Sequence, residues 1–496
     1  MTNNQIIILA ILIVYLIVNF VVGIFFSKKQ DKASSMGFEK KYFIGSRGMN
    51  GFVLAMTTVA TYTSVSSFVS GPGAAGLTYG FSQAWVAGVQ VGAAFLTLGV
   101  LGKKFAVISR KTGAVTIAGY LKARYKSDAL VIITTLLMLT FFVAQMIGQF
   151  MGGATLIESV TGLPYWLALL IFALVVIAYT AFGGFTAVVI TDTIQGVIML
   201  IGTFLFLFYV VSNLGSFEAM STTLDTTLPG WDTLTGTGYA PGSLLSFWVL
   251  VGVGVLGLPQ TAVRGMGFKD TKSCHNAMLV GTIVAGILMI GMHVGGVWAG
   301  ALVGEQTFTS TDYFIPTIVQ QIMPTGMAGL FLAAPMAAVM STVSSLLILA
   351  SASIVKDLWK TYVVKDDPKK LAKFNKTISY SSFLATLVIG LIVFVLTLTP
   401  PEIIFWVQLF AMGGLEATFF WPIVGGIFYK NGNKQAAITS SVVGVLVYVI
   451  SYQFKITVWN INAVVWGLLF SGIAYFVIGH LTCKNGLEQD VLDSCF

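Results

Sequence analysis

Long apolar runs alternate with short polar connections along almost the whole chain of 496 residues. A bilayer core of about 30 Å needs roughly 20 apolar residues per helix. Windows of that length predict about thirteen membrane-spanning helices and hence an all-α polytopic membrane protein. Their expected limits are 5–26, 50–75, 80–101, 128–152, 163–181, 186–212, 244–263, 276–303, 326–355, 378–398, 403–428, 435–453 and 461–481.

The composition supports this class. Hydrophobic residues make up 56% of the chain and charged residues only 9%, whereas soluble domains are about 25% charged. That polar surface is too small to cover soluble domains, and the same numbers exclude disorder and a coiled coil. Three cysteines and three histidines show neither a disulfide framework nor metal-ligand spacing. The first apolar run lacks a preceding basic segment, so we expect a retained helix rather than a signal peptide.

The basic residues predict the orientation. If the N-terminus lies outside, 26 of the 27 Lys and Arg residues fall on cytoplasmic connections or the tail, and only Lys455 lies outside. This split follows the positive-inside rule and requires an odd number of spans. The charges therefore act as topology determinants and do not form a nucleic-acid surface. The outside connections 213–243 and 304–325 are acidic, and each is either a lid with a short helix or a plain solvated loop.

Two predicted spans contain residues that interrupt helices. Span 50–75 has eight Ser and Thr residues between Thr57 and Ser70, followed by a Gly-Pro-Gly triplet. Hydroxyl side chains compete for backbone hydrogen bonds, so this span is either a broken helix whose free carbonyls bind a cation or a closely packed polar helix. Span 244–263 contains three glycines and Pro259 within eight residues.

These two spans are five apart, as expected for the first helices of two five-helix repeats inserted in opposite orientations. The implied division of the chain is a first helix with a basic cytoplasmic loop, a first repeat, an external loop, a second repeat, two C-terminal helices and a cytoplasmic tail. The corresponding ranges are 1–49, 50–212, 213–243, 244–428, 429–481 and 482–496.

A few polar groups lie within predicted spans. Ser341 and Thr342 form a small hydroxyl pair that suits either a hard monovalent cation or close packing of small residues. A charge at membrane depth is costly, so Asp192 is interpreted as part of an ion route or gate, with a structural cap as the alternative. Glu416 fits a functional and a structural role equally, and His293 is interpreted as a hydrogen-bonded packing residue. Neither a catalytic constellation nor a Walker A motif is present, so we expect neither an enzyme nor a pump driven by ATP within this chain.

Several stretches resemble one family of transporters. The segment 179–187 (YTAFGGFTA), followed by 191–195 (TDTIQ), resembles the signature of the sodium:solute symporter family, and 338–342 (AVMST) resembles its sodium motif. Within that family the chain is most similar to the bacterial branch that transports pantothenate. The matching stretches are 42–52, 71–75, 257–264, 331–338, 413–417 and 421–422.

The resemblance implies a leucine-transporter-type core of five plus five helices, with one helix before it and two after. It also implies Na⁺ as the coupling ion, pantothenate as the small-molecule substrate, a bacterial cytoplasmic membrane as the location, and neither an organic cofactor nor a protein or nucleic-acid partner. Asp192 matches an aspartate associated with sodium release, and Arg47 matches an arginine near an internal gate. The family's sodium ligands correspond to Ala60, Thr63, Ala338, Ser341 and Thr342.

The chain also departs from a neighbouring branch. Proline symporters of this family carry an aspartate where this chain has Tyr62 and aromatic residues where it has Val251 and Val255, which argues against proline as the substrate. A half-helix N-terminus is expected to face the carboxylate of the substrate. From their chemistry and span position, the candidate substrate contacts are Tyr62, Gln145, Gln149 and Gln260. The alternatives are a symporter for another small organic acid or osmolyte and, in another class, a solute sensor or a channel.

Overall fold

Helices account for the regular structure in the part of the chain that the structure describes. This computed structural model describes residues 2–33, 48–236, 238–304, 306–365, 367–400, 404–482 and 488–496. Within these ranges, eleven helices are long and apolar enough to cross a bilayer, and two further helix pairs reach that length only together, across a bend. The eleven helices and two pairs coincide with the thirteen predicted spans, so the predicted polytopic helical class is confirmed.

Most spans are single helices or short helices joined end to end. The third span is built from consecutive segments between Phe81 and Thr112. These are α5 (Phe81–Gly88), η4 (Val89–Gly92), α6 (Ala93–Leu96), η5 (Thr97–Gly102) and α7 (Lys103–Thr112). The other unbroken spans belong to α1 (Asn3–Ala33), α9 (Asp128–Thr161), α10 (Tyr165–Asn213), α14 (Thr271–Gly300), α16 (Thr325–Ala352) with η10 (Ser353–Val364), α17 (Pro368–Thr397), α18 (Ile404–Phe428), α19 (Lys434–Gln453) and α20 (Ala463–Thr482).

A single glycine divides α10 into two spans. Gly184 has φ 68° and ψ −178°, a conformation that residues with a Cβ rarely adopt. The chain therefore changes direction there, and the spans Tyr165–Phe185 and Ala187–Asn213 follow one another without a loop. This turn gives a physical reason for the paired glycines in the 179–187 segment.

The two predicted interruptions are real bends. The first separates α3 (Gly51–Tyr62) from the continuous segment Ser66–Tyr79, at an angle of 76°. The second separates Pro241–Gly257 from Pro259–Met266, at 50°. Leu258 has extended backbone angles there, as the residue before a proline prefers. The component helices are η2 (Ser66–Ser70), α4 (Gly71–Ala74), η3 (Ala75–Tyr79), α12 (Pro241–Phe247), η6 (Trp248–Gly252), η7 (Val253–Gly257), α13 (Pro259–Ala262) and η8 (Val263–Met266).

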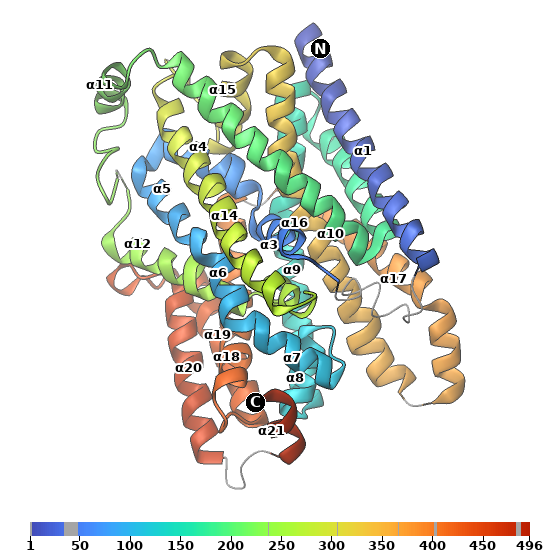
Figure 1. The fold of residues 1–496 in the computed structure, drawn as a ribbon. Coiled ribbons are helices and arrows are strands. Elements are labelled where there is room, and N and C mark those ends of the chain that lie inside the picture. The colour runs from blue at the N-terminus through green and yellow to red at the C-terminus, as the bar shows by residue number, and fades with distance from the viewer. Residues whose placement is uncertain are drawn as a thin grey trace.

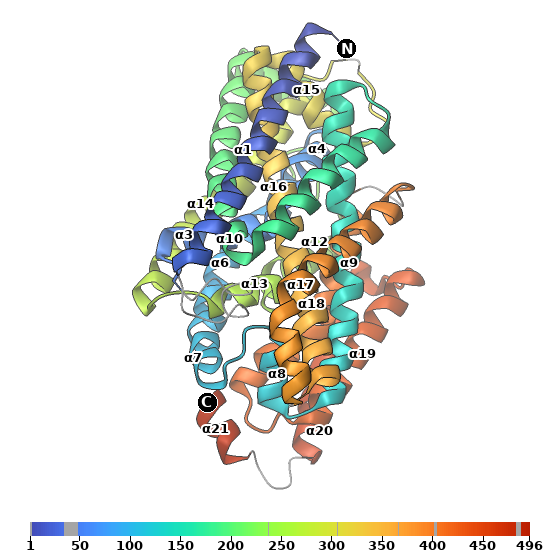
Figure 2. The same ribbon diagram turned by 90° about the vertical axis from the view of Figure 1, so that its right-hand side faces the viewer.

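Helix α16 forms the centre of the bundle. In its most apolar stretch 94% of the residues are buried, compared with 33% in α1 and α17, which lie on the outside of the bundle (Figures 1 and 2). It packs against α10, α9 and α3. Because α16 carries Ser341 and Thr342, this central position places both hydroxyls next to the first bent span.

The two ends of the bundle carry short helices. The N- and C-termini lie at opposite ends, as an odd number of spans requires (Figure 1). Connections 213–243 and 304–325 contain α11 (Phe217–Thr227), η9 (Thr311–Tyr313) and α15 (Phe314–Ile322). In η9, Asp312 is buried, accepts a hydrogen bond from the backbone N–H of Ile404 at 3.4 Å, and has its pKa raised by burial. The opposite end carries α8 (Ile117–Tyr125) and α21 (Gln489–Cys495), which are joined by an ion pair between Lys126 and Asp490.

Candidate ion and substrate site

The break in the first bent span exposes backbone groups inside the bundle. Helix α3 ends at Tyr62, and Thr63 has extended backbone angles. The Ser64 and Ser66 hydroxyls contact each other at 2.6 Å, and the backbone N–H of Val65 donates to Gln149 Oε1 of α9 at 3.2 Å. The Gln149 side chain thus replaces a helical hydrogen bond of Val65 at the break, which helps to make a non-helical backbone tolerable at this depth.

Five oxygen atoms gather at this break, from α16, from α3 and from Thr63 just after it. Ser341 Oγ lies 2.9 Å from the carbonyl oxygen of Ala60 and 3.0 Å from that of Ala338. Thr342 Oγ1 lies 3.1 Å from the carbonyl oxygen of Thr63 and 3.0 Å from that of Ala338. These five residues are the ones carried over from the family's sodium site, and the structure brings all of them together in the buried core.

The donor set fits a small hard cation. Carbonyl and hydroxyl oxygens are ligands for such ions, and without a carboxylate among the five the set suits a monovalent ion. In the present arrangement both hydroxyls donate to carbonyls, and a bound cation would draw the oxygens of both groups toward itself. Thr63 Oγ1 is also buried without a hydrogen-bond partner.

A buried ion pair lies beside this oxygen cluster. Arg264 Nη2 lies 3.1 Å from Asp192 Oδ2, and both side chains are almost completely inaccessible to solvent. The same Nη2 donates to Thr61 Oγ1 at 2.8 Å and to Ser345 Oγ at 2.5 Å, and Thr57 Oγ1 donates to Asp192 Oδ2 at 2.8 Å. The pair therefore connects α3, α10, α16 and the end of the second bent span.

The sequence interpretation missed the burial of Arg264. Arg264 counted as one of the basic residues of a cytoplasmic connection, but in the structure it belongs to η8 and is 2% exposed. Arg264 directly follows an interrupted span, and a turn at such an interruption can return the chain into the bundle. This position is the feature of the sequence that could have indicated its burial. Arg47, predicted as an internal gate residue, lies outside the described residues.

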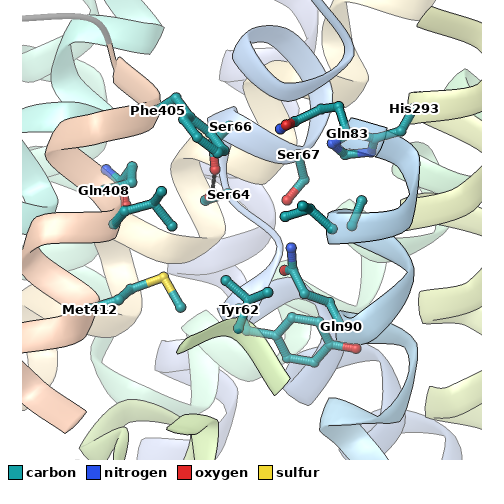
Figure 3. A pocket seen from close by; sticks show the side chains of 14 residues that line it. Tyr62, Ser64, Ser66, Ser67, Gln83, Gln90, His293, Phe405, Gln408 and Met412 are labelled. Atoms are coloured by element: carbon teal, nitrogen blue, oxygen red, sulfur yellow. Dashed lines mark hydrogen bonds between the residues drawn. The ribbon is translucent and has the colours of Figure 1, made fainter. Parts of the chain in front are cut away.

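A narrow cavity lies on the other side of the break (Figure 3). Its volume of about 30 Å³ is room for roughly two water molecules, so the walls must separate before an organic solute can enter. Gln408 and Met412 lie on one side of it, and Gln83 and Gln90 face them from the other (Figure 3). The lining residues are Tyr62, Ser64, Ser66, Ser67, Gln83, Val86, Ala87, Gln90, Val251, His293, Phe405, Gln408, Leu409 and Met412.

Of the four candidate substrate contacts, Tyr62 lines this cavity, and its hydroxyl has no hydrogen-bond partner. Gln145, Gln149 and Gln260 are not among the lining residues and form a layer of amides nearby. Gln260 Nε2 donates to Gln145 Oε1 at 3.2 Å, and Gln408 Nε2 donates to the backbone carbonyl of Gln145 at 2.7 Å. Gln149 Nε2, Gln260 Oε1 and Gln408 Oε1 have no partners, so this layer keeps free donors and acceptors.

The two other polar residues that the sequence places within spans, His293 and Glu416, lie in different surroundings. His293 lines the cavity, and its Nδ1 donates to the carbonyl of Met289 at 2.8 Å, so the residue interpreted as packing also faces the candidate substrate space. Glu416 is completely buried, and neither carboxyl oxygen has a hydrogen-bond partner. Gln83, Gln90 and Gln408 were missed because an apolar span does not reveal which of its faces lines a cavity.

Comparison with known proteins agrees with this architecture. The chain matches the model of the sodium:solute symporter family over residues 42–444. It is 43% identical to a sodium/pantothenate symporter of Haemophilus influenzae, with 97% of each chain covered, and 42% identical to one of Escherichia coli, with 94% of this chain and 95% of that one covered.

A solved structure of a Na⁺-coupled sialic acid symporter in a substrate-bound outward-open state superposes with a TM-score of 0.76 and 20% identity. The superposition covers 97% of this chain and 98% of that one, which shows a leucine-transporter-type fold as predicted. The family model spans most of the chain, and the two pantothenate relatives cover nearly all of it. The chain therefore belongs to the sodium:solute symporter family.

Proposed function

We propose that this protein takes up pantothenate across the bacterial cytoplasmic membrane, driven by sodium through alternating access. The observation that carries this proposal is identity of 42–43% to two sodium/pantothenate symporters over nearly the full length. The converging oxygens of α3 and α16 support the sodium part, and the polar cavity beside them supports the solute part.

Sodium binds where the first bent span meets α16. Its ligands are the carbonyls of Ala60, Thr63 and Ala338 with the hydroxyls of Ser341 and Thr342. A cation at this point orders the break, and residues on the other side of the same break line the cavity. Sodium therefore improves substrate binding, and by linkage the substrate improves sodium binding by the same factor.

The substrate carboxylate is held by the break rather than by a basic side chain. The cavity lining contains neither Lys nor Arg. The segment Ser66–Tyr79 begins at the break, so its positive N-terminal end and the hydroxyls of Ser66 and Ser67 face the cavity. Tyr62 and Gln408 offer partners for the hydroxyl and amide groups of pantothenate, while the amides of Gln145, Gln149 and Gln260 support the wall from behind.

The orientation follows from the basic residues, with the N-terminus outside and the C-terminus in the cytoplasm. In this orientation α3 runs from the cytoplasm to the break, so Asp192 and Arg264 lie on the cytoplasmic side of the oxygen cluster. Opening of that ion pair gives sodium and substrate a route to the cytoplasm. The narrow cavity then corresponds to a closed stage of the cycle.

The test is uptake of labelled pantothenate into proteoliposomes with and without an inward sodium gradient, with protein-free liposomes as the control. We expect sodium-dependent accumulation above the outside concentration. Sodium-driven uptake that another organic acid or osmolyte competes for, but pantothenate does not, would assign a different substrate. Flux without saturation or sodium coupling would indicate a channel, and binding without uptake would indicate a sensor.

A further inference from the structure

Glu416 is a buried carboxyl group that the proposed cycle leaves without a role. Glu416 is completely inaccessible to solvent, and both of its oxygens lack hydrogen-bond partners. Among the described residues, Asp192 is also a fully buried intramembrane carboxyl, but it is paired with Arg264 and accepts from Thr57. Since an ionised carboxylate is costly to bury without a partner, Glu416 is stable in this conformation only as the neutral acid.

Its position connects it to the moving parts of the transporter. Phe405, Gln408, Leu409 and Met412 of α18 line the cavity, at a spacing that defines one helix face. Glu416 lies on the same face, one turn and about 6 Å further along the axis. In the proposed orientation this direction leads from the cavity to the cytoplasm.

Glu416 also contacts the second bent span directly. A Cβ atom added at Gly254 of η7 would lie 2.2 Å from Glu416 Oε2, so only a glycine leaves room for the carboxyl group. One turn later, a Cβ at Gly257 would lie 3.0 Å from the backbone of Phe420. The carboxyl is thus enclosed between α18 and the bend, and any separation of these two segments admits water to it.

The groups around Glu416 offer little to stabilise a negative charge on its carboxyl group. The hydroxyl of Tyr448 of α19 donates to the carbonyl of Phe410 and not to Glu416. Neither η7 nor the rest of α18 contains an ionisable side chain. Among the other helices packed against α18, α9 carries Asp128 and Glu158 near its ends, α20 carries Tyr475 and His480, and α8 carries Arg124. None of these groups forms a hydrogen bond with Glu416. Ionisation therefore requires water from outside the protein.

We propose that Glu416 is a proton-binding site on the cytoplasmic route, which loses its proton when α18 and the second bent span separate and must regain it from the cytoplasm before they close again. This inference rests on the proposed function and orientation. The proton is bound and released on the same side, so it is not carried across the membrane. High cytoplasmic pH slows the return of the empty transporter.

The experiment measures sodium-driven pantothenate uptake in vesicles of uniform orientation, with the pH varied only on the cytoplasmic side. Raising that pH by about two units should slow wild-type uptake several-fold, since each unit above the midpoint lowers the protonated fraction about tenfold. In Glu416→Gln, which cannot ionise, the rate should be independent of cytoplasmic pH. Glu218→Gln, the same change on exposed α11, should retain the wild-type profile. A wild-type rate independent of cytoplasmic pH, or a Glu416→Gln variant with the wild-type profile, would overturn the proposal.

A second measurement does not depend on transport or on the variant. Infrared spectra of wild-type protein labelled with ¹³C-glutamate at neutral pH should contain the carbonyl stretch of a protonated glutamic acid in the presence of sodium. Only ionised glutamate bands would show that Glu416 is charged, and the proposal would fail. Because no substrate is used, this result separates an error about Glu416 from an error about pantothenate.

Discussion

The two bent spans interrupt their helices in different ways. At the first break, between Tyr62 and Ser66, the surroundings are hydroxyls, carbonyls and the amide of Gln149. At the second, around Leu258, η7 itself has no polar side chain, and its glycines allow α18 to approach the backbone closely. The first break therefore provides ligands, whereas the second provides a closely packed contact that can open.

The same two spans are held together at one end. The backbone N–H of Met49, just before α3, donates to the carbonyl of Gly267, and the N–H of Lys269 donates back to Met49. Arg264, at the end of the second bent span, donates to Thr61 of the first. We therefore expect a change in ion binding at one break to be transmitted to the other.

The largest effect is expected from breaking this connection. Asp192→Asn or Arg264→Gln leaves one partner of a buried ion pair uncompensated, which costs about 3–5 kcal/mol. Each single variant should unfold at a clearly lower temperature and lose uptake, and the double variant should recover part of the stability. Thermal unfolding of purified protein measures this. Single variants as stable as wild type would show that the pair does not hold the two spans together.

The next effect concerns the ligands of the first break. Ser341→Ala combined with Thr342→Ala removes two hydroxyls that we assign to sodium. Hydrogen bonds to charged groups contribute about 1.5–3 kcal/mol each, so the loss of two should raise the sodium concentration for half-maximal uptake at least about a hundredfold. Ser353→Ala is the matched control, because that hydroxyl donates only within its own helix, to Leu349. An unchanged sodium dependence in the double variant, with the protein in the membrane, would contradict the site assignment.

A smaller effect tests the packing at the second break. Gly257→Ala places a methyl group 3.0 Å from backbone atoms of Phe420, which cannot move as a side chain can. Such overpacking costs about 2 kcal/mol, and we expect it to favour separation of α18 from the bend and to change turnover more than sodium affinity. Gly286→Ala is the control, since its methyl group meets only Val91 at 3.5 Å. Equal effects of the two changes on turnover would argue against a moving contact.

The local chemistry of the chain was sufficient to predict the thirteen spans and both bends. Ser and Thr clusters, glycines and Pro259 weaken a helix wherever it packs, so their effect is visible without a structure. The convergence of α3 and α16, in contrast, could not be predicted from local chemistry. Ser341 and Thr342 suggested a hydroxyl pair, but their partners Ala60 and Thr63 are backbone carbonyls of unremarkable residues, and only the family resemblance indicated them.

What could not be predicted depends on helix rotation and on chain reversals. Nearly uniform apolarity hides which face of α5, η4 or α18 is turned inward, so Gln83, Gln90 and Gln408 were missed. Gln260 was placed in the cavity on chemistry alone, whereas in the structure it donates to Gln145 outside the lining. Arg264 was treated as a topology marker because the positive-inside rule counts basic residues without knowing which of them fold back into the bundle.

The smallest expected effect is that of membrane potential, and it tests whether only the first break binds sodium. One Na⁺ moving with one pantothenate anion carries no net charge, and the proton of Glu416 returns to the side it came from. A second sodium ion at the second break would add about 2.3 kcal/mol per 100 mV, equivalent to about a fiftyfold change in the accumulation ratio. We therefore expect the final accumulation of pantothenate to stay nearly constant when a potassium diffusion potential is imposed on proteoliposomes. A potential dependence of that size would mean that the two breaks do not divide their roles as we propose, because the closely packed second break would then have to contribute ligands of its own.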